Sequence, residues 1–375
     1  MRTLVITNDF PPRPGGIQAF VHALVARRPP ESVVVYAPAW PGADSFDARQ
    51  RFPVVRHPTS LMLPGPGMTR RVAEIARRER CSSVLFGAAA PLGLLAPALR
   101  RVGVVRFVAL THGHEASWAV LPGARQLLGH IGDRVDAVTY LGEYTRARLA
   151  RALSAPATQC MARLAPGVDV TTFRPGAGGA AVRERLGLGT RPVVVCVSRL
   201  VHRKGQDALV RAWPQVLRAV PNAALLLVGG GPERARLERL AAEVGVRGWV
   251  WFTGPVLPEE LPAHYDAGNV FAMPCRTRRF GLDVEGLGLV YLEASATGLP
   301  VVAGASGGAP DAVHDGETGH VVDGCSPEDV AATVIGLLRD PQRARAMGEK
   351  GRSWVEREWT WEHAAACLDE LLALD

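Results

Sequence analysis

The chain has 375 residues, of which 47% are hydrophobic and 21% are charged, and its formal net charge is +7. This composition excludes disordered and fibrous proteins, and the length favours two domains. The basic charge suits phosphate-bearing ligands or an anionic surface. A genome-wide bias toward Ala, Arg, Gly and Pro explains it equally well.

The six cysteines stand far apart, with no Cys-x-x-Cys pair and no Cys/His cluster. Neither a zinc site nor a disulfide framework is therefore indicated. The longest apolar run, 84–99, is shorter than a bilayer span and contains two prolines. The apolar run at the N-terminus is too short for a signal peptide. We expect a soluble or peripheral protein of the reducing cytoplasm.

Short β-branched runs alternate with helical patterns along the first half of the chain. The runs typical of buried parallel strands are 3–8, 32–38, 83–88, 104–112 and 137–142. The helical patterns between them cover 17–28, 68–80 and 124–132. A Pro- and Gly-rich stretch, 164–179, then breaks the alternation and indicates a domain connection.

The same alternation resumes in the second half. Strands are predicted at 192–200, 224–231, 250–254, 270–275, 300–308 and 319–324, and helices at 205–220, 232–244, 258–268 and 359–374. Each half therefore reads as a doubly wound α/β domain, 1–170 and 171–358, with helix 359–375 packing back on the first. Because ligands bind at the carboxyl ends of such strands, we expect two domains facing each other across a deep cleft.

Gly15 and Gly16 open the first predicted helix after a Pro-rich loop. Paired glycines let backbone N–H groups approach an anion at a helix N-terminus. A tight turn that needs glycine is the better interpretation of this feature alone.

Arg199 and Lys204 follow a predicted strand and precede a helix. A guanidinium fork and a mobile ammonium are a common pairing for a diphosphate. Two solvated surface cations are the alternative.

Another strand ends in His112 and His114, which predicts a polar wall. No third ligand is spaced for a metal, so hydrogen bonding or charge stabilisation is favoured over metal binding. Structural histidines are the alternative.

The stretch 283–300 reads mostly as a buried helix, yet it carries Glu285 and Glu293. Eight residues of helix span about 12 Å, which is near the reach from a ribose to the sugar beyond its diphosphate. Carboxylates accept hydrogen bonds from vicinal hydroxyls, so one ligand can satisfy both. Alternatively, both glutamates form salt bridges with arginines of the run 276–279.

The predicted helix 68–80 carries five arginines and follows an apolar loop. Such a helix can dock on an anionic membrane leaflet. A solvated basic helix is the competing interpretation.

In combination, these features resemble the retaining GT-B glycosyltransferases of family 4, over the whole chain. The segments 111–115 (THGHE), 198–207 (SRLVHRKGQD) and 283–288 (DVEGLG) resemble most closely the actinobacterial GDP-mannose-dependent phosphatidylinositol monomannoside mannosyltransferases. Phe280 and Leu282 depart from the expected residues near the sugar, and Asp311 stands where Glu is common.

The resemblance implies roles for individual residues. Arg199 and Lys204 would bind the diphosphate, Glu293 the ribose hydroxyls, and Glu285 the donor sugar. His112 would lie near the anomeric centre. The remaining implied residues are Gly15, Gly16, Gly286, Leu287, Gly288 and Leu289 for the donor phosphates and sugar, Gly230, Gly231 and Val256 for the base, and His114 and Asp9 near the acceptor or sugar.

The resemblance further implies transfer of mannose from GDP-mannose, with retention, to a phosphatidylinositol mannoside in an α-1,6 linkage. It implies a peripheral enzyme at the inner face of the plasma membrane, with no metal cofactor and no nucleic-acid partner. The alternatives are another nucleotide sugar, such as a UDP-sugar, used on a soluble acceptor, an epimerase on the same fold, and a non-catalytic binder.

Overall fold

The computed structural model describes residues 2–113, 115–119, 121–278, 281 and 283–374. The chain divides into two compact units. Unit 1 comprises 1–167 and 361–375, and unit 2 comprises 168–360. The boundary at Gly167 falls inside the Pro- and Gly-rich stretch that predicted a domain connection.

Unit 1 is built on a parallel sheet whose described strands run in the order β3-β2-β1-β4-β5-β6-β7. The strands are β1 (Thr3–Ile6), β2 (Val33–Pro38), β3 (Val54–His57), β4 (Ser83–Phe86), β5 (Arg106–Ala109), β6 (Ala137–Tyr140) and β7 (Met161–Arg163). The helices are α1 (Gly16–Ala26), α2 (Ala43–Asp47), α3 (Pro66–Arg78), α4 (Ala96–Arg100), α5 (Glu115–Trp118), α6 (Ala124–Gly132), α7 (Glu143–Ala150), α8 (Ala155–Gln159) and α16 (Trp361–Leu372).

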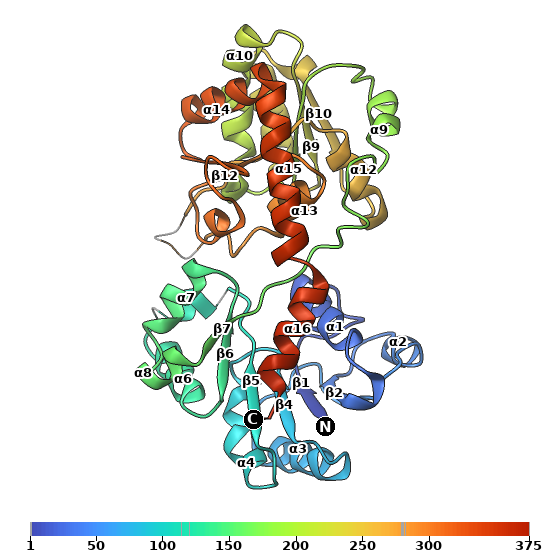
Figure 1. Ribbon diagram of the computed structural model, residues 1–375, viewed down its shortest axis with the longest axis vertical. Helices are drawn as coiled ribbons and strands as arrows, with labels where there is room; N and C mark the ends of the chain where they lie inside the picture. Colours follow the sequence, from blue (N-terminus) through green and yellow to red (C-terminus); the bar gives the residue numbers. More distant parts are fainter. Residues whose placement is uncertain (1, 114, 120, 279–280, 282, 375) are drawn as a thin grey trace. The chain divides into compact units, whose positions relative to one another are not determined.

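Successive strand residues of unit 1 enter different cores, as the period of two along a strand requires. Leu4 and Ile6 pack with residues of α3 and α4, whereas Val5 packs with residues of α1 and α16. Both faces of the sheet are therefore covered, which explains the continuous apolar runs of its strands. The red C-terminal helix α16 lies among the elements of unit 1 (Figure 1).

Unit 2 has a second parallel sheet, with described strands in the order β10-β9-β8-β11-β12-β13. They are β8 (Val193–Val197), β9 (Ala224–Val228), β10 (Val250–Gly254), β11 (Val270–Met273), β12 (Val301–Gly304) and β13 (Gly319–Val322). The helices are α9 (Gly179–Arg185), α10 (Gln206–Ala219), α11 (Arg234–Glu243), α12 (Leu261–Asp266), α13 (Leu289–Ala296), α14 (Pro327–Arg339) and α15 (Pro341–Glu358). The protein thus contains two Rossmann-like α/β folds.

The sequence reading missed two edge strands of unit 1, β3 and β7. The residues of β3 are only partly buried, and β7 has three residues that include the exposed Arg163. Neither strand has the continuous apolar run that marked the central strands, because an edge strand has fewer buried neighbours. Among the described residues, no helix is both long and apolar enough to cross a bilayer.

Candidate active site

The carboxyl ends of β8 and β11 are neighbours in the sheet of unit 2. The first leads into Arg199 and the 3₁₀ turn η3 (His202–Lys204), and the second leads into the loop that carries Glu285. The chain order of the strands reverses between β8 and β11, and open α/β sheets bind ligands at such a reversal. Arg199, Lys204 and Glu285 therefore follow two neighbouring strands at this edge of the sheet.

Glycines let the loops at this edge pack backbone against backbone. A Cβ atom at Gly205 would lie 1.9 Å from the carbonyl oxygen of Pro274, and one at Gly308 would lie 2.2 Å from that of Gly286. The N–H of Gly308 also donates to the carbonyl of Glu285 at 2.8 Å. Larger side chains at these glycines would push the Glu285 loop out of place.

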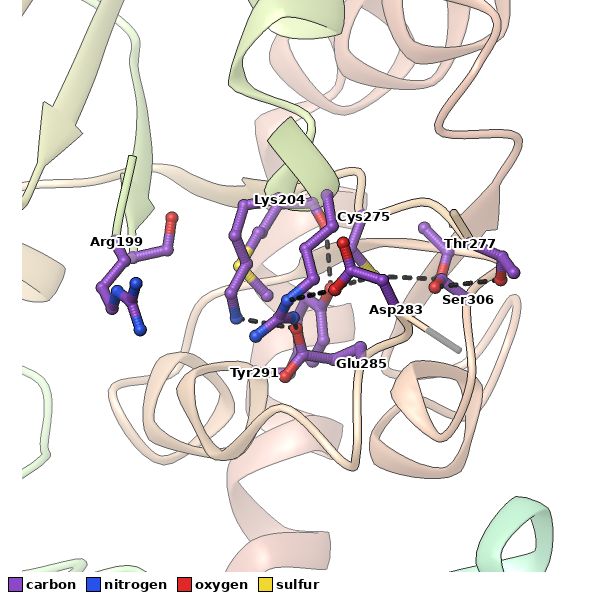
Figure 2. Close-up of polar contacts among 12 residues, drawn as sticks. Arg199, Lys204, Cys275, Thr277, Asp283, Glu285, Tyr291 and Ser306 are labelled. Atoms are coloured by element: carbon purple, nitrogen blue, oxygen red, sulfur yellow. Dashed lines mark hydrogen bonds and ion pairs between the residues drawn. The ribbon is translucent and has the colours of Figure 1, made fainter. Parts of the chain in front are cut away.

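Glu285, which is buried, is the centre of a charge cluster (Figure 2). Its Oε2 atom accepts from Nζ of Lys204 at 2.7 Å and from the guanidinium of Arg203 at 2.5 Å. Arg203 also pairs with Asp283 at 3.3 Å. Two cations and two anions thus balance one another, which reduces the cost of burying Lys204 and Glu285.

Arg203 was missed in the sequence, although it precedes Lys204 directly. The run 276–279 was the suggested source of partners for the two glutamates. Arg276 instead binds Asp207 and the carbonyl of His202, so that interpretation is wrong for Arg276. Which arginine pairs with Glu285 depends on how the loops fold, and the spacing of residues along the chain does not encode that.

Arg199 differs from the cluster in being exposed. Among the described residues, its guanidinium has no hydrogen-bond or ion-pair partner, and in Figure 2 it lies apart from the Lys204–Glu285 pair without a dashed contact. The predicted diphosphate pair therefore consists of one neutralised cation and one uncompensated cation. An anionic ligand would gain most from Arg199, because nothing in the described chain offsets its charge.

The predicted helix over 283–300 is shorter than expected. Helix α13 begins at Leu289, and Gly288 precedes it with a φ of 83°, a left-handed conformation that favours glycine. Only half of the interval from Glu285 to Glu293 is helical, so the estimate of its span from helix rise was wrong. Gly286 and Gly288 both precede the first residue of the helix.

Glu293 on α13 has a hydrogen-bond donor that the sequence did not reveal. The hydroxyl of Tyr265, on α12, donates to its Oε2 atom at 2.6 Å. Burial raises the pKa of the Glu293 carboxyl, and the hydrogen bond from Tyr265 opposes that rise. Burial also raises the pKa of the Tyr265 phenol well above its ordinary value, so the hydroxyl remains a donor.

The loops predicted to receive the base lie together. The N–H of Gly229 donates to the carbonyl of Gly254 at 2.9 Å, and a Cβ atom at Gly230 would lie 3.2 Å from Pro255. A Cβ atom at Gly231 would lie 2.3 Å from the carbonyl oxygen of Leu200. Close packing thus accounts for Gly231, and Val256 is partly buried beyond Pro255. Base binding at these loops stays a prediction.

In unit 1, the glycine pair stands where the sequence placed it. Gly16 is the first residue of α1, and Gly15 precedes it with a φ of 158°. Apart from its chain neighbours and the backbone of its own helix, no described atom would lie within 4 Å of a Cβ at Gly16. Behind the pair, the amide of Gln18 donates to Asp9 at 2.7 Å, and Arg13 lies 4.0 Å from the same carboxylate. Asp9 is therefore engaged inside unit 1.

His112 follows β5 and is held from two sides. Its Nε2 atom lies 2.5 Å from the carbonyl oxygen of Gly87, which can only accept, so Nε2 carries the proton. Its ring meets Phe20 edge-on with 5.8 Å between the centroids. The backbone N–H of His112 donates to Glu115. Three other predicted residues, His114, Phe280 and Leu282, lie outside the described residues.

No group of three or more His, Cys, Asp and Glu side chains in the described parts of the chain is placed to hold a metal ion. In unit 2, the candidate site includes the cationic side chains of Arg199, Arg203 and Lys204. Fixed cations of this kind can stabilise an anionic leaving group. Metal independence stays a prediction until it is measured.

Two family models match the chain. Residues 14–172 match the model described as Glycosyltransferase Family 4, and residues 180–354 match Glycosyl transferases group 1. The two matches fall largely on unit 1 and unit 2, respectively.

Curated relatives match over nearly the whole chain. The GDP-mannose-dependent alpha-(1-6)-phosphatidylinositol monomannoside mannosyltransferase of Mycolicibacterium smegmatis is 52% identical, covering 99% of this chain and 98% of its own. The GDP-mannose-dependent monoacylated alpha-(1-6)-phosphatidylinositol monomannoside mannosyltransferase of Corynebacterium glutamicum is 46% identical, covering 99% and 97%.

Solved structures share the fold at low identity. Anabaena HepE in complex with UDP aligns with a TM-score of 0.83 at 18% identity, over 99% of both chains. A glycosyltransferase from Rickettsia africae aligns with a TM-score of 0.79 at 15% identity, over 100% of this chain and 99% of its own.

Proposed function

This chain belongs to family 4 of the glycosyltransferases, and on that premise we propose that it transfers mannose from GDP-mannose to a phosphatidylinositol monomannoside through an α-1,6 linkage. The observation that carries the proposal is 52% identity, across almost the full length of both chains, to enzymes named for that reaction. Identity spread over both units makes the same donor and acceptor the simplest assignment.

Unit 2 supplies the cations for the donor diphosphate. Arg199 is exposed and uncompensated, and Lys204 is held by Glu285 at the same edge of the sheet. When the bond between C1 of the mannose and the phosphate oxygen breaks, negative charge develops on the departing GDP. Both cations stabilise that charge, as a divalent ion does in other transferases.

Transfer proceeds with retention, and the acceptor hydroxyl attacks C1 from the face that GDP leaves. The hydroxyl proton passes to the departing phosphate oxygen, the new bond joins C1 to the acceptor oxygen, and GDP is released. No side chain acts as a nucleophile in this scheme. Glu285 orients the donor sugar, and the resemblance assigns His112 to the anomeric centre.

The membrane surface that carries the acceptor contacts α3 and the loop before it. Leu61 and Leu63 in this loop are 53% and 61% exposed. The buried face of α3 packs into unit 1 through Val72 and Ile75. Its outward face and the turn that follows it bear exposed arginines, which are Arg70, Arg77, Arg78 and Arg80. An apolar loop beside a basic face matches the anionic leaflet of a cytoplasmic membrane.

A transfer assay tests the proposed reaction. The purified enzyme is incubated with phosphatidylinositol monomannoside and either GDP-mannose, UDP-glucose or ADP-glucose, and the glycolipid mass and linkage are determined. We expect a gain of one hexose from GDP-mannose alone, with an α-1,6 bond. Transfer from UDP-glucose, or hydrolysis of GDP-mannose without a glycolipid product, would refute the donor or acceptor assignment.

A further inference from the structure

Tyr265 is a fully buried residue whose hydroxyl is committed to one partner. Its ring packs edge-on against Phe173 and tilted on Phe271, with centroids 5.6 Å and 5.7 Å apart. The hydroxyl donates to Oε2 of Glu293 at 2.6 Å. The contact joins α12 to α13 across 28 positions of sequence. An aromatic ring fixed on two sides holds its hydroxyl in one place.

Glu293 needs such a support if it is to bind a ligand in a single geometry. Its side chain is partly buried, and no described residue hydrogen-bonds its Oε1 atom. The terminal torsion of a glutamate is broad, so an unsupported carboxylate would sample many orientations. With Oε2 held by Tyr265, Oε1 is the oxygen left for a ligand.

We propose that Tyr265 is a positioning residue that locks the Glu293 carboxylate in the orientation in which Oε1 receives a ribose hydroxyl of the donor. The proposal rests on the proposed function insofar as the donor is a ribonucleotide sugar. It does not depend on the base or on the sugar. Tyr265 itself contacts no part of the donor and acts only through Glu293.

The test uses Tyr265→Phe, which removes the hydroxyl and keeps the ring contacts with Phe173 and Phe271. The matched control is Tyr36→Phe in unit 1, where a buried tyrosine hydroxyl bonds Nδ1 of His57 at 2.6 Å. For each full-length variant, the dissociation constants of GDP and of 2′,3′-dideoxy-GDP are measured by calorimetry. The KM for donor and kcat are measured in parallel.

We expect Tyr265→Phe to weaken GDP binding about tenfold, the scale of one lost hydrogen bond to a charged group, with kcat changed by less than about twofold. Because Tyr265 acts only through the bond between Glu293 and the ribose, the same variant should bind dideoxy-GDP nearly as well as the wild type does. Tyr36→Phe should keep the full preference of the wild type for GDP. An equal loss for both nucleotides in Tyr265→Phe would overturn the proposal.

The binding measurements distinguish a wrong donor assignment from a wrong role for Tyr265. If GDP fails to stabilise or bind the wild type, UDP and ADP are tested with their dideoxy forms. A ribose-dependent loss with either of these keeps the role of Tyr265 and refutes GDP as the donor nucleotide. Ribose-independent binding of every nucleotide by the wild type would overturn the proposal for Tyr265.

Discussion

Lys204 and Glu285 form an ion pair at 2.7 Å, and each residue is less than a tenth exposed. The resemblance implied different parts of one donor for them, the diphosphate for the lysine and the sugar for the glutamate. Their pairing makes the two roles interdependent, because a change at either residue also alters the charge presented by the other.

A stability assay should therefore distinguish Arg199 from Lys204, the two cations predicted to bind the diphosphate. Arg199→Ala removes an exposed side chain, so we expect turnover to fall about 10²- to 10³-fold with little change in melting temperature. Lys204→Ala should lower turnover as much and also destabilise the fold by about 1–3 kcal/mol, since Glu285 loses a buried partner. The measurements are kcat at saturating donor and thermal unfolding. Near-normal turnover in either variant would refute its leaving-group role.

Arg203 should determine how much positive charge the site presents to the anionic donor. It contacts both Asp283 and Glu285, so Arg203→Ala leaves two carboxylates against Lys204 alone. We expect the KM for donor to rise about tenfold, an effect that grows at low ionic strength, because the site becomes less attractive to an anion. Arg203→Lys should recover part of the loss.

A control for this prediction is Arg236→Ala, which removes a partly exposed arginine that pairs with Glu233 at 2.8 Å and with Asp207 at 3.6 Å. Its KM for donor should stay within about twofold of the wild-type value. If the rise in KM caused by Arg203→Ala does not depend on ionic strength, Arg203 acts through packing and not through its charge.

Ionisation of the buried Glu293 carboxyl should lower the free energy of unfolding at neutral pH. Burial raises the pKa of its carboxyl in the folded chain, so the folded state binds the proton more tightly than the unfolded state does. This loss of unfolding free energy is therefore absent below the ordinary pKa of a glutamate, and it grows as the pH rises toward the raised pKa of Glu293. Glu293→Gln cannot ionise, and we expect its melting temperature relative to wild type to increase over that interval.

Thermal unfolding of both proteins between about pH 4 and 8 measures this difference. The control is Glu259→Gln, because Glu259 is an exposed residue of the turn before α12. It should differ from wild type by a constant small amount at every pH. A constant difference for Glu293→Gln as well would contradict the prediction.

Membrane binding should depend on the basic face of α3. Reversal of Arg70, Arg77, Arg78 and Arg80 to Glu should reduce co-sedimentation with anionic liposomes more than 10²-fold, since each cation near an anionic surface contributes about 1 kcal/mol. Neutral liposomes should bind both proteins weakly. The control reverses four exposed arginines of unit 2, which are Arg211, Arg218, Arg239 and Arg345. Equal loss in both variants would show that net charge, and not α3, drives binding.

Turnover should persist when divalent ions are removed. Fixed cations at the unit 2 edge can stabilise the leaving group without a metal ion. Addition of about 5 mM chelator to dialysed enzyme should leave kcat within roughly twofold of its starting value, because no step of the proposed transfer uses an ion. A loss restored by Mg²⁺ or Mn²⁺ would disprove metal independence.

The local sequence predicted strands that have a continuous apolar run better than strands that lack one. β8 and β9 lie inside continuous apolar runs, and their ends were placed within a few residues. β7 has three residues and no such run, so its pairing with β6 could not be anticipated. Helix α13 also starts later than predicted, because the irregular loop continues to Gly288, whose backbone is in the left-handed conformation.

By itself, the sequence determined that two parallel-sheet folds form, that Arg199 and Lys204 follow a strand, and that Glu293 lies on a helix. Periodicity and chain order carry that information, since each buried strand is a local apolar run. Only the tertiary structure decided the partners of these side chains. Arg203 and Lys204 reach Glu285 across 82 and 81 positions, and Tyr265 reaches Glu293 across 28. Contacts at such separations depend on how the loops pack, which spacing along the chain does not encode.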